Sequence, residues 1–255
     1  MKQCARSAWT ELRDELLFAQ PESSHLGNCP ICFLPLPLDK TKSGMMSCCS
    51  KVICNGCRHA NKIRELNASM KRKCSFCRHP VPATDAEIDA NIMKRAEAND
   101  LVALREMGIQ CYKRGEYIRA FEYLSKAARL GDADALYQLS SMYLEGKRVE
   151  KDEKMAVYHA EEAAIAGHPT ARFNLGVIEW NNGSKERAMK HWHWIIAAKL
   201  GKANSVEMLK KGYKEGSVRK DDFDAALRVH QAAVDAMKSP QREAAHAELR
   251  KVMRR

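Results

Sequence analysis

The chain has 255 residues, of which 43 are Lys or Arg and 32 are Asp or Glu, so its formal net charge is +11. A membrane-spanning helix needs about 20 consecutive apolar residues, and no such run occurs, so we expect no membrane span. A basic protein can bind nucleic acid, but no aromatic residues that would stack on bases interleave the basic run Lys71–Lys73. We therefore do not expect nucleic acid to be a partner.

A helical stripe of apolar residues opens the chain. Apolar side chains recur at helical spacing at Ala5, Trp9, Leu12, Leu16 and Leu17. This period predicts an amphipathic helix within residues 1–24. We expect the helix to pack on the cysteine-rich region that follows or on a partner protein.

Eight of the ten cysteines form the next segment, as three Cys-x2-Cys pairs and one adjacent pair. The pairs are Cys29 and Cys32, Cys48 and Cys49, Cys54 and Cys57, and Cys74 and Cys77. A Cys-x2-Cys pair lets two thiolates reach one zinc ion, and two pairs complete a tetrahedron. Eight thiolates therefore predict two bound Zn²⁺ ions, with no open position for a catalytic water.

The alternative to zinc sites is the disulfide framework of a small secreted domain. The chain lacks a secretory signal, and the rest of it has the pattern of an intracellular helical protein. We therefore favour metal binding and expect the protein in the cytoplasm or nucleus.

The spacing of the cysteine pairs resembles that of the RING finger family. In that family the first and third pairs hold one zinc ion, and the second and fourth pairs hold the other. The resemblance implies a small cross-brace domain at residues 25–82. Its ligands would be Cys29, Cys32, Cys54 and Cys57 at the first site, and Cys48, Cys49, Cys74 and Cys77 at the second.

The second site departs from the usual RING pattern. RING fingers commonly have a histidine shortly before the third cysteine pair, but Lys51 stands at that position. The sequence is closer to all-cysteine RING fingers, although adjacent ligands on one metal are sterically awkward. The alternative is that His59 or His79 replaces one of the two cysteines Cys48 and Cys49.

The resemblance also implies a surface for a ubiquitin-conjugating enzyme, which RING fingers bind in a shallow apolar groove between the metal loops. By position, the groove residues would be Ile31, Ile63 and Pro80. Arg78 would be the cation that clamps ubiquitin onto the conjugating enzyme. The helix after Cys57 lacks the tryptophan that is common in the family, which implies a weak groove.

From residue 99 the sequence repeats itself. Gly131, Gly167 and Gly201 recur 36 and 34 residues apart, and each follows an alanine pair. A period of about 35 residues predicts a solenoid of helical hairpins, in which glycine ends a helix cheaply. We place the repeats at 99–240, between a linker helix at 83–98 and a basic C-terminal helix at 241–255. The capping-box residues Thr84 and Glu87 mark the start of the linker helix.

These repeats resemble Sel-one-like repeats, which are related to tetratricopeptide repeats. The motif Ala-x3-Leu-Gly-x2-Tyr-x2-Gly is matched in part by Ala135, Leu139, Tyr143 and Gly146. The resemblance implies about four repeats with a concave, protein-binding surface. The expected fold class is mainly α, with a small cross-brace zinc finger followed by an α-helical repeat solenoid.

One repeat unit is longer than the others. Its marker alanine, Ala188, lies nine residues before its alanine pair, where three other units have seven. Trp180, Trp192 and Trp194 in this unit form a candidate aromatic docking site for a partner. The alternative is that one of these tryptophans belongs to the core and another covers the edge of the groove.

The function expected from both resemblances is that of a ubiquitin ligase without a covalent intermediate. The finger would recruit a ubiquitin-conjugating enzyme, and the repeats would bind a protein substrate. The alternative is a zinc-binding scaffold for protein–protein interaction that has no ligase activity. A zinc-dependent lipid binder of the FYVE kind is disfavoured, because its basic His-His-Cys-Arg strand is absent.

Overall fold

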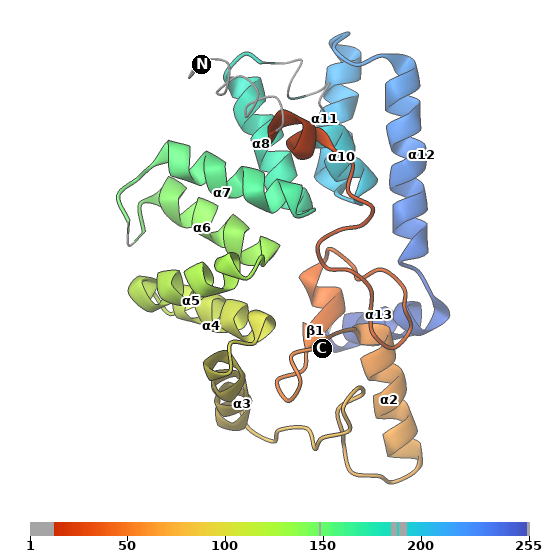
Figure 1. Cartoon of the computed structure of the whole chain (residues 1–255). Helices are drawn as coiled ribbons and strands as arrows, with labels where there is room; N and C mark the ends of the chain where they lie inside the picture. The colour runs from red at the N-terminus through yellow and green to blue at the C-terminus, as the bar shows by residue number, and fades with distance from the viewer. Residues whose placement is uncertain (1–12, 148, 185–187, 189–192, 254–255) are drawn as a thin grey trace. The chain divides into compact units, whose positions relative to one another are not determined.

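The computed structural model describes residues 13–147, 149–184, 188 and 193–253 (Figure 1). The protein is mainly α-helical, as the sequence predicts. A 3-10 turn, η1 (Lys40–Lys42), precedes the antiparallel strands β1 (Ser43–Met45) and β2 (Val52–Cys54). The helices are α2 (Asn55–Asn67), α3 (Asp85–Glu97), α4 (Leu101–Lys113), α5 (Tyr117–Arg129), α6 (Ala133–Glu145), α7 (Glu153–Ile165), α8 (Pro169–Asn181), α10 (His193–Lys199), α11 (Ala203–Lys214), α12 (Lys220–Ala236) and α13 (Pro240–Met253). Each helix in the described part of the chain is too short or too polar to span a bilayer.

The chain divides into two compact units, and each unit combines separate parts of the sequence. One unit consists of the described part of Met1–His25 together with Ala128–Ala233. The other consists of Leu26–Ala127 together with Val234–Arg255. The second unit therefore holds the eight closely spaced cysteines and the C-terminal helix.

In the cysteine-rich unit, α13 lies against α2, and α3 lies against α4 (Figure 1). The predicted capping box opens α3, because the Thr84 side chain accepts the N–H of Glu87 and the Glu87 carboxylate accepts the N–H of Ala83. Helices α4 and α5 approach closely at Gly108, where a Cβ atom would lie 2.6 Å from Cγ of Leu124. Glycine is required at this contact because any side chain would collide with the buried leucine.

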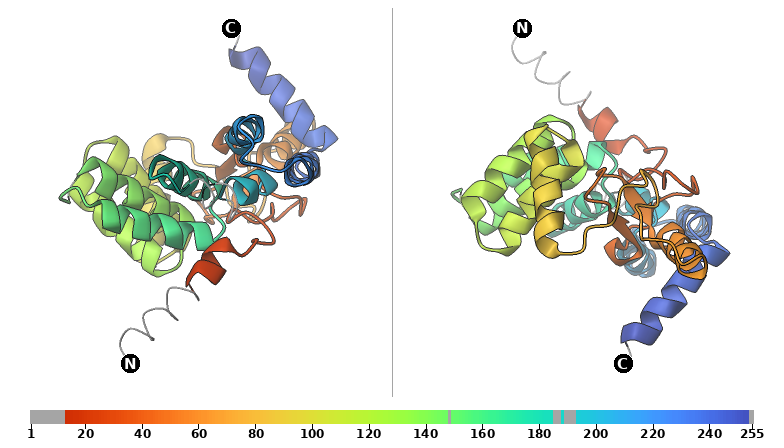
Figure 2. Two further views of the ribbon diagram at one scale, coloured as in Figure 1. Left: turned by 90° about the horizontal axis from the view of Figure 1, so that it is seen from above. Right: turned by 90° about the horizontal axis from the view of Figure 1, so that it is seen from below.

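In the other unit, α6 and α7 pack side by side, α7 packs on α8, and α10 packs on both α8 and α11 (Figure 2). The side chains of Asp132 and Asp152 accept backbone N–H groups at the starts of α6 and α7. Gly167 and Gly201 follow helix ends with left-handed φ values of 82° and 92°. The alanine pair Ala163–Ala164 is fully buried, which fits close approach between helices.

The N-terminal segment packs on the repeat helices. Residues 13–18 are helical, and Leu17 is 2% exposed in a core with Ala160 and Leu175. The fully buried Arg172 guanidinium donates to the carbonyl oxygens of Leu17 and Ala164, which fixes the end of this helix. This arrangement corrects the expectation that the helix packs on the cysteine-rich region. The predicted stripe residues Ala5, Trp9 and Leu12 lie outside the described residues.

Trp194 is a core residue. Its side chain is fully buried, and its Nε1–H donates to the carbonyl oxygen of Phe173 at 3.1 Å. A Cβ atom on Gly176 would lie 2.5 Å from this Nε1. The burial rules out Trp194 as a docking residue and supports the alternative that one of the tryptophans belongs to the core. Trp180 packs half-buried against the same core, and Trp192 lies outside the described residues.

We predict that Trp194→Ala lowers the free energy of unfolding by about 3–5 kcal/mol. The substitution leaves a large cavity, and Gly176, which lies against the indole ring, has no side chain that could fill it. Urea unfolding followed by far-UV circular dichroism measures the change. Trp180→Ala is the matched control and should cost less, since part of its ring is exposed. Equal losses in the two variants would contradict the core assignment.

Candidate metal centre

The structure gathers the eight cysteines into two groups of four. The Sγ atoms within each group all lie within 4.8 Å of one another. The first group is Cys29, Cys32, Cys54 and Cys57, and the second is Cys48, Cys49, Cys74 and Cys77. This is the grouping that the RING resemblance implies. Neither His59 nor His79 belongs to the described cluster at the second site.

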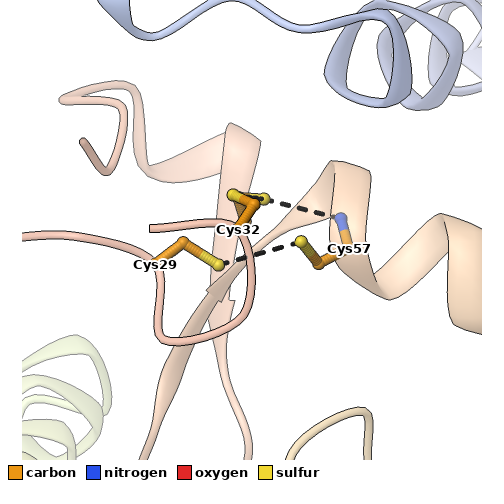
Figure 3. Close-up of side chains that lie close together, drawn as sticks. Cys29, Cys32 and Cys57 are labelled. Atoms are coloured by element: carbon orange, nitrogen blue, oxygen red, sulfur yellow. Dashed lines mark hydrogen bonds between the residues drawn. The ribbon is translucent and has the colours of Figure 1, made fainter. Parts of the chain in front are cut away.

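The distances between sulfur atoms fit tetrahedral metal coordination. They are 3.9 Å for Cys29–Cys57, 3.8 Å for Cys32–Cys54, 3.4 Å for Cys48–Cys77 and 3.9 Å for Cys49–Cys74. A disulfide bond would give about 2.0 Å, whereas two thiolates on a tetrahedral zinc ion with bonds of about 2.3 Å lie about 3.8 Å apart. Figure 3 shows the sulfur atoms of Cys29 and Cys57 facing each other. Each group can therefore hold one metal ion.

The loops that begin at Cys29 and at Cys74 adopt the same backbone turn. The first cysteine of each pair donates its N–H to the carbonyl five residues later and accepts the N–H of the residue four positions later. These bonds join Cys29 to Leu34 and Phe33, and Cys74 to His79 and Arg78. Phe33 and Arg78 have left-handed φ values of 57° and 64°. The turn presents both thiols of a Cys-x2-Cys pair to one position.

The same turn explains how the adjacent cysteines reach one site. Met46 donates its N–H to the carbonyl of Lys51 at 3.0 Å and accepts the N–H of Ser50 at 2.8 Å. Ser50 has a φ of 54°. The loop is thus a third copy of the turn, in which Met46 replaces the first cysteine and Cys49 is the second. Cys48 lies inside the turn and supplies the other thiol, so this tight turn overcomes the steric problem anticipated from the sequence.

The two groups differ in burial, and each contains one thiol whose pKa is lowered beside others whose pKa is raised. Cys29, Cys54 and Cys57 belong to a buried core, whereas the second group is more exposed. Burial opposes ionisation of Cys32, but hydrogen bonds with the Leu34 backbone and the Arg242 guanidinium lower its pKa to about 7. Burial and the nearby Cys74 thiol raise the pKa of Cys49 to about 11. In the second group the pKa of Cys77 is lowered, and in the first group burial raises the pKa of Cys57. Because metal binding displaces thiol protons, both groups depend on the metal for full ionisation of their thiols.

Each group is supported by an arginine from a helix outside the cysteine-rich segment. Arg242 in α13 donates to Sγ of Cys32 at 3.4 Å. Arg95 in α3 donates to Oγ of Ser50 at 2.7 Å and to the carbonyl oxygen of Cys48 at 3.4 Å. Sequence reasoning missed both residues, since neither belongs to a spacing pattern that marks it among 43 basic residues.

The residues predicted to form the conjugating-enzyme groove lie at the surface. Ile31 is 37% exposed and Ile63 is 41% exposed. Pro80 and Arg78 are also exposed, and the Arg78 guanidinium donates to Oδ1 of Asn61 at 2.8 Å. These side chains are therefore accessible to a partner.

A third group of potential ligands occurs in the other unit, formed by His25, Asp134 and His168. The Asp134 carboxylate lies 3.3 Å from Nε2 of His25 and 3.5 Å from Nε2 of His168. Nδ1 of His168 accepts the N–H of Ala171, so the proton of the neutral ring resides on Nε2. A metal ion needs the lone pair of that nitrogen. We therefore conclude that this buried group holds His25 against the repeat helices. The backbone N–H of His25 also donates to the carbonyl oxygen of Gly167.

We predict two zinc ions per chain and a second site made only of cysteine. Cys48→Ser and Cys49→Ser should each reduce the zinc content towards one ion per chain, because a four-thiolate site loses a ligand. Native mass spectrometry counts the bound metal. His59→Ala and His79→Ala are the controls and should retain two ions. Loss of a zinc ion in either histidine variant would show that the ligand set is wrong.

Comparison with known proteins identifies the repeats. Residues 101–132 and 133–168 match the family model of the Sel1 repeat, and these ranges correspond to the helix pairs α4–α5 and α6–α7. A crystal structure of a Sel1 repeat protein from Oxalobacter formigenes is similar, with 28% identity and a TM-score of 0.51 over 61% of this chain and 66% of that chain.

Two curated proteins are similar over shorter segments. Chitin synthase regulatory factor 4 of Schizosaccharomyces pombe is 35% identical over 88 residues, which are 34% of this chain and 14% of that protein. An uncharacterized protein of Neisseria meningitidis serogroup B is 41% identical over 92 residues, which are 35% of this chain and 20% of that protein. The chain thus spans a fifth or less of these relatives. Residues 101–168 form two Sel1 repeats, which confirms the Sel-one-like prediction for this part of the chain.

Proposed function

We propose that this protein is a zinc-stabilised scaffold for protein–protein interaction. The observation that carries the proposal is that both cysteine groups are complete four-thiolate sites. A zinc ion with four protein ligands has no open position for water or substrate, which is the arrangement of a structural site. The metal would supply folding energy rather than chemistry.

Zinc is the metal that the donor set fits best. Soft thiolate ligands in a tetrahedral arrangement select zinc or iron–sulfur centres rather than calcium or magnesium. The cysteine-rich segment has a small core, in which Cys29, Cys54 and Cys57 are themselves buried members with Leu36 and Ile53. Structural zinc contributes on the order of 10 kcal/mol to such folds, so the metal stabilises a segment that has few other apolar contacts.

The Sel1 repeats would provide the surface for a protein partner. Stacked helical hairpins create extended surfaces that bind other proteins. One similar protein is called a regulatory factor of an enzyme, and a role in regulation through binding suits a chain whose metal sites are closed. The partner would be a folded protein or a segment of one.

We expect that cross-linking of the zinc-loaded protein to its partner in native extract, followed by mass spectrometry, places the cross-links in residues 101–168. A solvent-exposed residue of the cysteine-rich segment, Lys62, serves as the internal reference for random labelling. If cross-links to the partner gather around Lys62 and are absent from the repeats, the proposed role of the repeats is wrong.

Ubiquitin transfer is the second candidate function, and the exposure of Ile31 favours it. This residue lies between two ligands of the first site, and the next exposed apolar side chain, Phe33, is 75% exposed in the same turn. Apolar side chains held outward by a metal loop gain free energy when a partner covers them. Arg78, which follows the last ligand, would supply the cation expected in the RING family.

An assay of ubiquitin discharge from a panel of loaded conjugating enzymes separates the two functions. As a scaffold, the protein should leave the discharge rate unchanged. A protein that accelerates discharge would instead be a ligase. Ile31→Ala should then reduce the acceleration about tenfold, because it removes about 1–3 kcal/mol of association free energy. Arg78→Ala should then slow discharge while leaving enzyme binding nearly intact. Both variants should retain two zinc ions, which controls for folding.

A further inference from the structure

Helix α13 is seated on the first metal site through a contact that requires glycine. A Cβ atom on Gly56 would lie 2.8 Å from Cγ of Arg242 and 2.9 Å from its backbone nitrogen. Gly56 lies in the first turn of α2, between Cys54, which caps this helix, and the ligand Cys57. The close approach therefore brings α13 to the part of α2 that carries the metal ligands.

The Arg242 side chain donates hydrogen bonds to the loop of the first metal site, which contains Cys32. Its Nη1 donates to the carbonyl oxygens of Pro35 at 2.7 Å and Met237 at 2.8 Å. Its Nη2 donates to the carbonyl oxygen of Leu34 at 3.2 Å and to Sγ of Cys32 at 3.4 Å. The planar guanidinium group thus connects the sulfur of Cys32, the turn that holds this cysteine, and the start of the short segment between α12 and α13.

The negative charge of a metal-loaded site would favour this contact with a cation. Four thiolates around one divalent ion carry a net charge of −2, which is costly to bury without a nearby cation. An arginine side chain keeps its charge in proteins, and Nη2 of Arg242 lies 3.4 Å from Sγ of Cys32. Partners of this outer shell orient the ligands and tune metal affinity.

We infer that α13 is part of the first metal centre, with Arg242 as the counter-cation of the metal-bound Cys32 thiolate. Metal binding and the docking of α13 are therefore coupled. Coupling between two binding events is reciprocal in free energy, so metal at the first site strengthens the docking of α13, and docked α13 raises the affinity of that site for the metal. We expect the higher affinity to appear as slower release. This inference rests on the proposed zinc binding.

Arg95 shows how the second site differs. It donates to Oγ of Ser50 and to the carbonyl oxygen of Cys48. Both of these bonds end on an oxygen atom and neither ends on a sulfur atom. These contacts support the loop that carries Cys48 and Cys49 rather than the charge of a thiolate. A change at Arg242 should therefore affect one of the two metal ions and leave the other unchanged.

The test follows zinc release from the full-length, zinc-loaded protein after addition of excess chelator, with native mass spectrometry to count the ions that remain. Arg242→Gln should accelerate the release of one ion on the order of tenfold, the lower end of the effect of outer-shell substitutions, and leave the second ion at the wild-type rate. Arg242→Lys keeps the charge but loses the planar fork, so its release rate should lie between those of the wild type and Arg242→Gln. Arg250→Gln, on an exposed position of the same helix, is the matched control and should match the wild type.

Hydrogen exchange provides the reciprocal measurement. Amides of α13 should exchange faster in zinc-loaded Arg242→Gln than in zinc-loaded Arg250→Gln. Release from Arg242→Gln at the wild-type rate, or equal acceleration of both ions, would overturn the inference. A wild-type protein that binds no zinc would instead overturn the proposed zinc binding, so the two failures are distinguishable.

Discussion

The convergence of eight thiols on two positions is the constraint on which the cysteine-rich segment depends. Sulfur atoms that approach within 3.4–3.9 Å as thiolates repel one another unless a cation lies between them. The remaining core of this segment is small and includes ligand cysteines among its buried members. Without a metal ion the same residues would bring like charges or protonated thiols into a core that has little else to hold it. The short strands, the turns and the start of α2 all serve to position these sulfur atoms.

The grouping of the eight cysteines was predictable from the sequence, but the way in which the chain forms it was not. Pair spacing identifies Cys29, Cys32, Cys54 and Cys57 because each Cys-x2-Cys pair is a local feature. The pair Cys48–Cys49 has no such local pattern. Its turn depends on backbone hydrogen bonds of Met46, a residue that cannot bind zinc in the manner of cysteine and therefore gives no signal.

The repeats were predictable for a related reason, because each repeat carries its own helix caps and small residues. The aspartates that cap α6 and α7 and the glycines that end helices act within a few residues of their positions in the sequence. Interactions between distant segments were not predictable. The burial of Leu17 against α7 and α8, the His25–Asp134–His168 group and the contact of Arg242 with the first metal loop join residues that no periodic pattern relates.

The contact between Arg242 and Cys32 also bears on the order in which the protein is made. The two residues are separated by 210 positions in the chain, and a ribosome synthesises the amino-terminal residue first. The four ligands of the first site leave the ribosome long before the arginine that covers it, so a nascent chain can take up metal while that site is still open on this side. Arrival of α13 would then convert a labile metal site into a protected one. Emergence of α13 from the ribosome, rather than metal uptake, would thus be the step at which a zinc ion at the first site becomes hard to exchange.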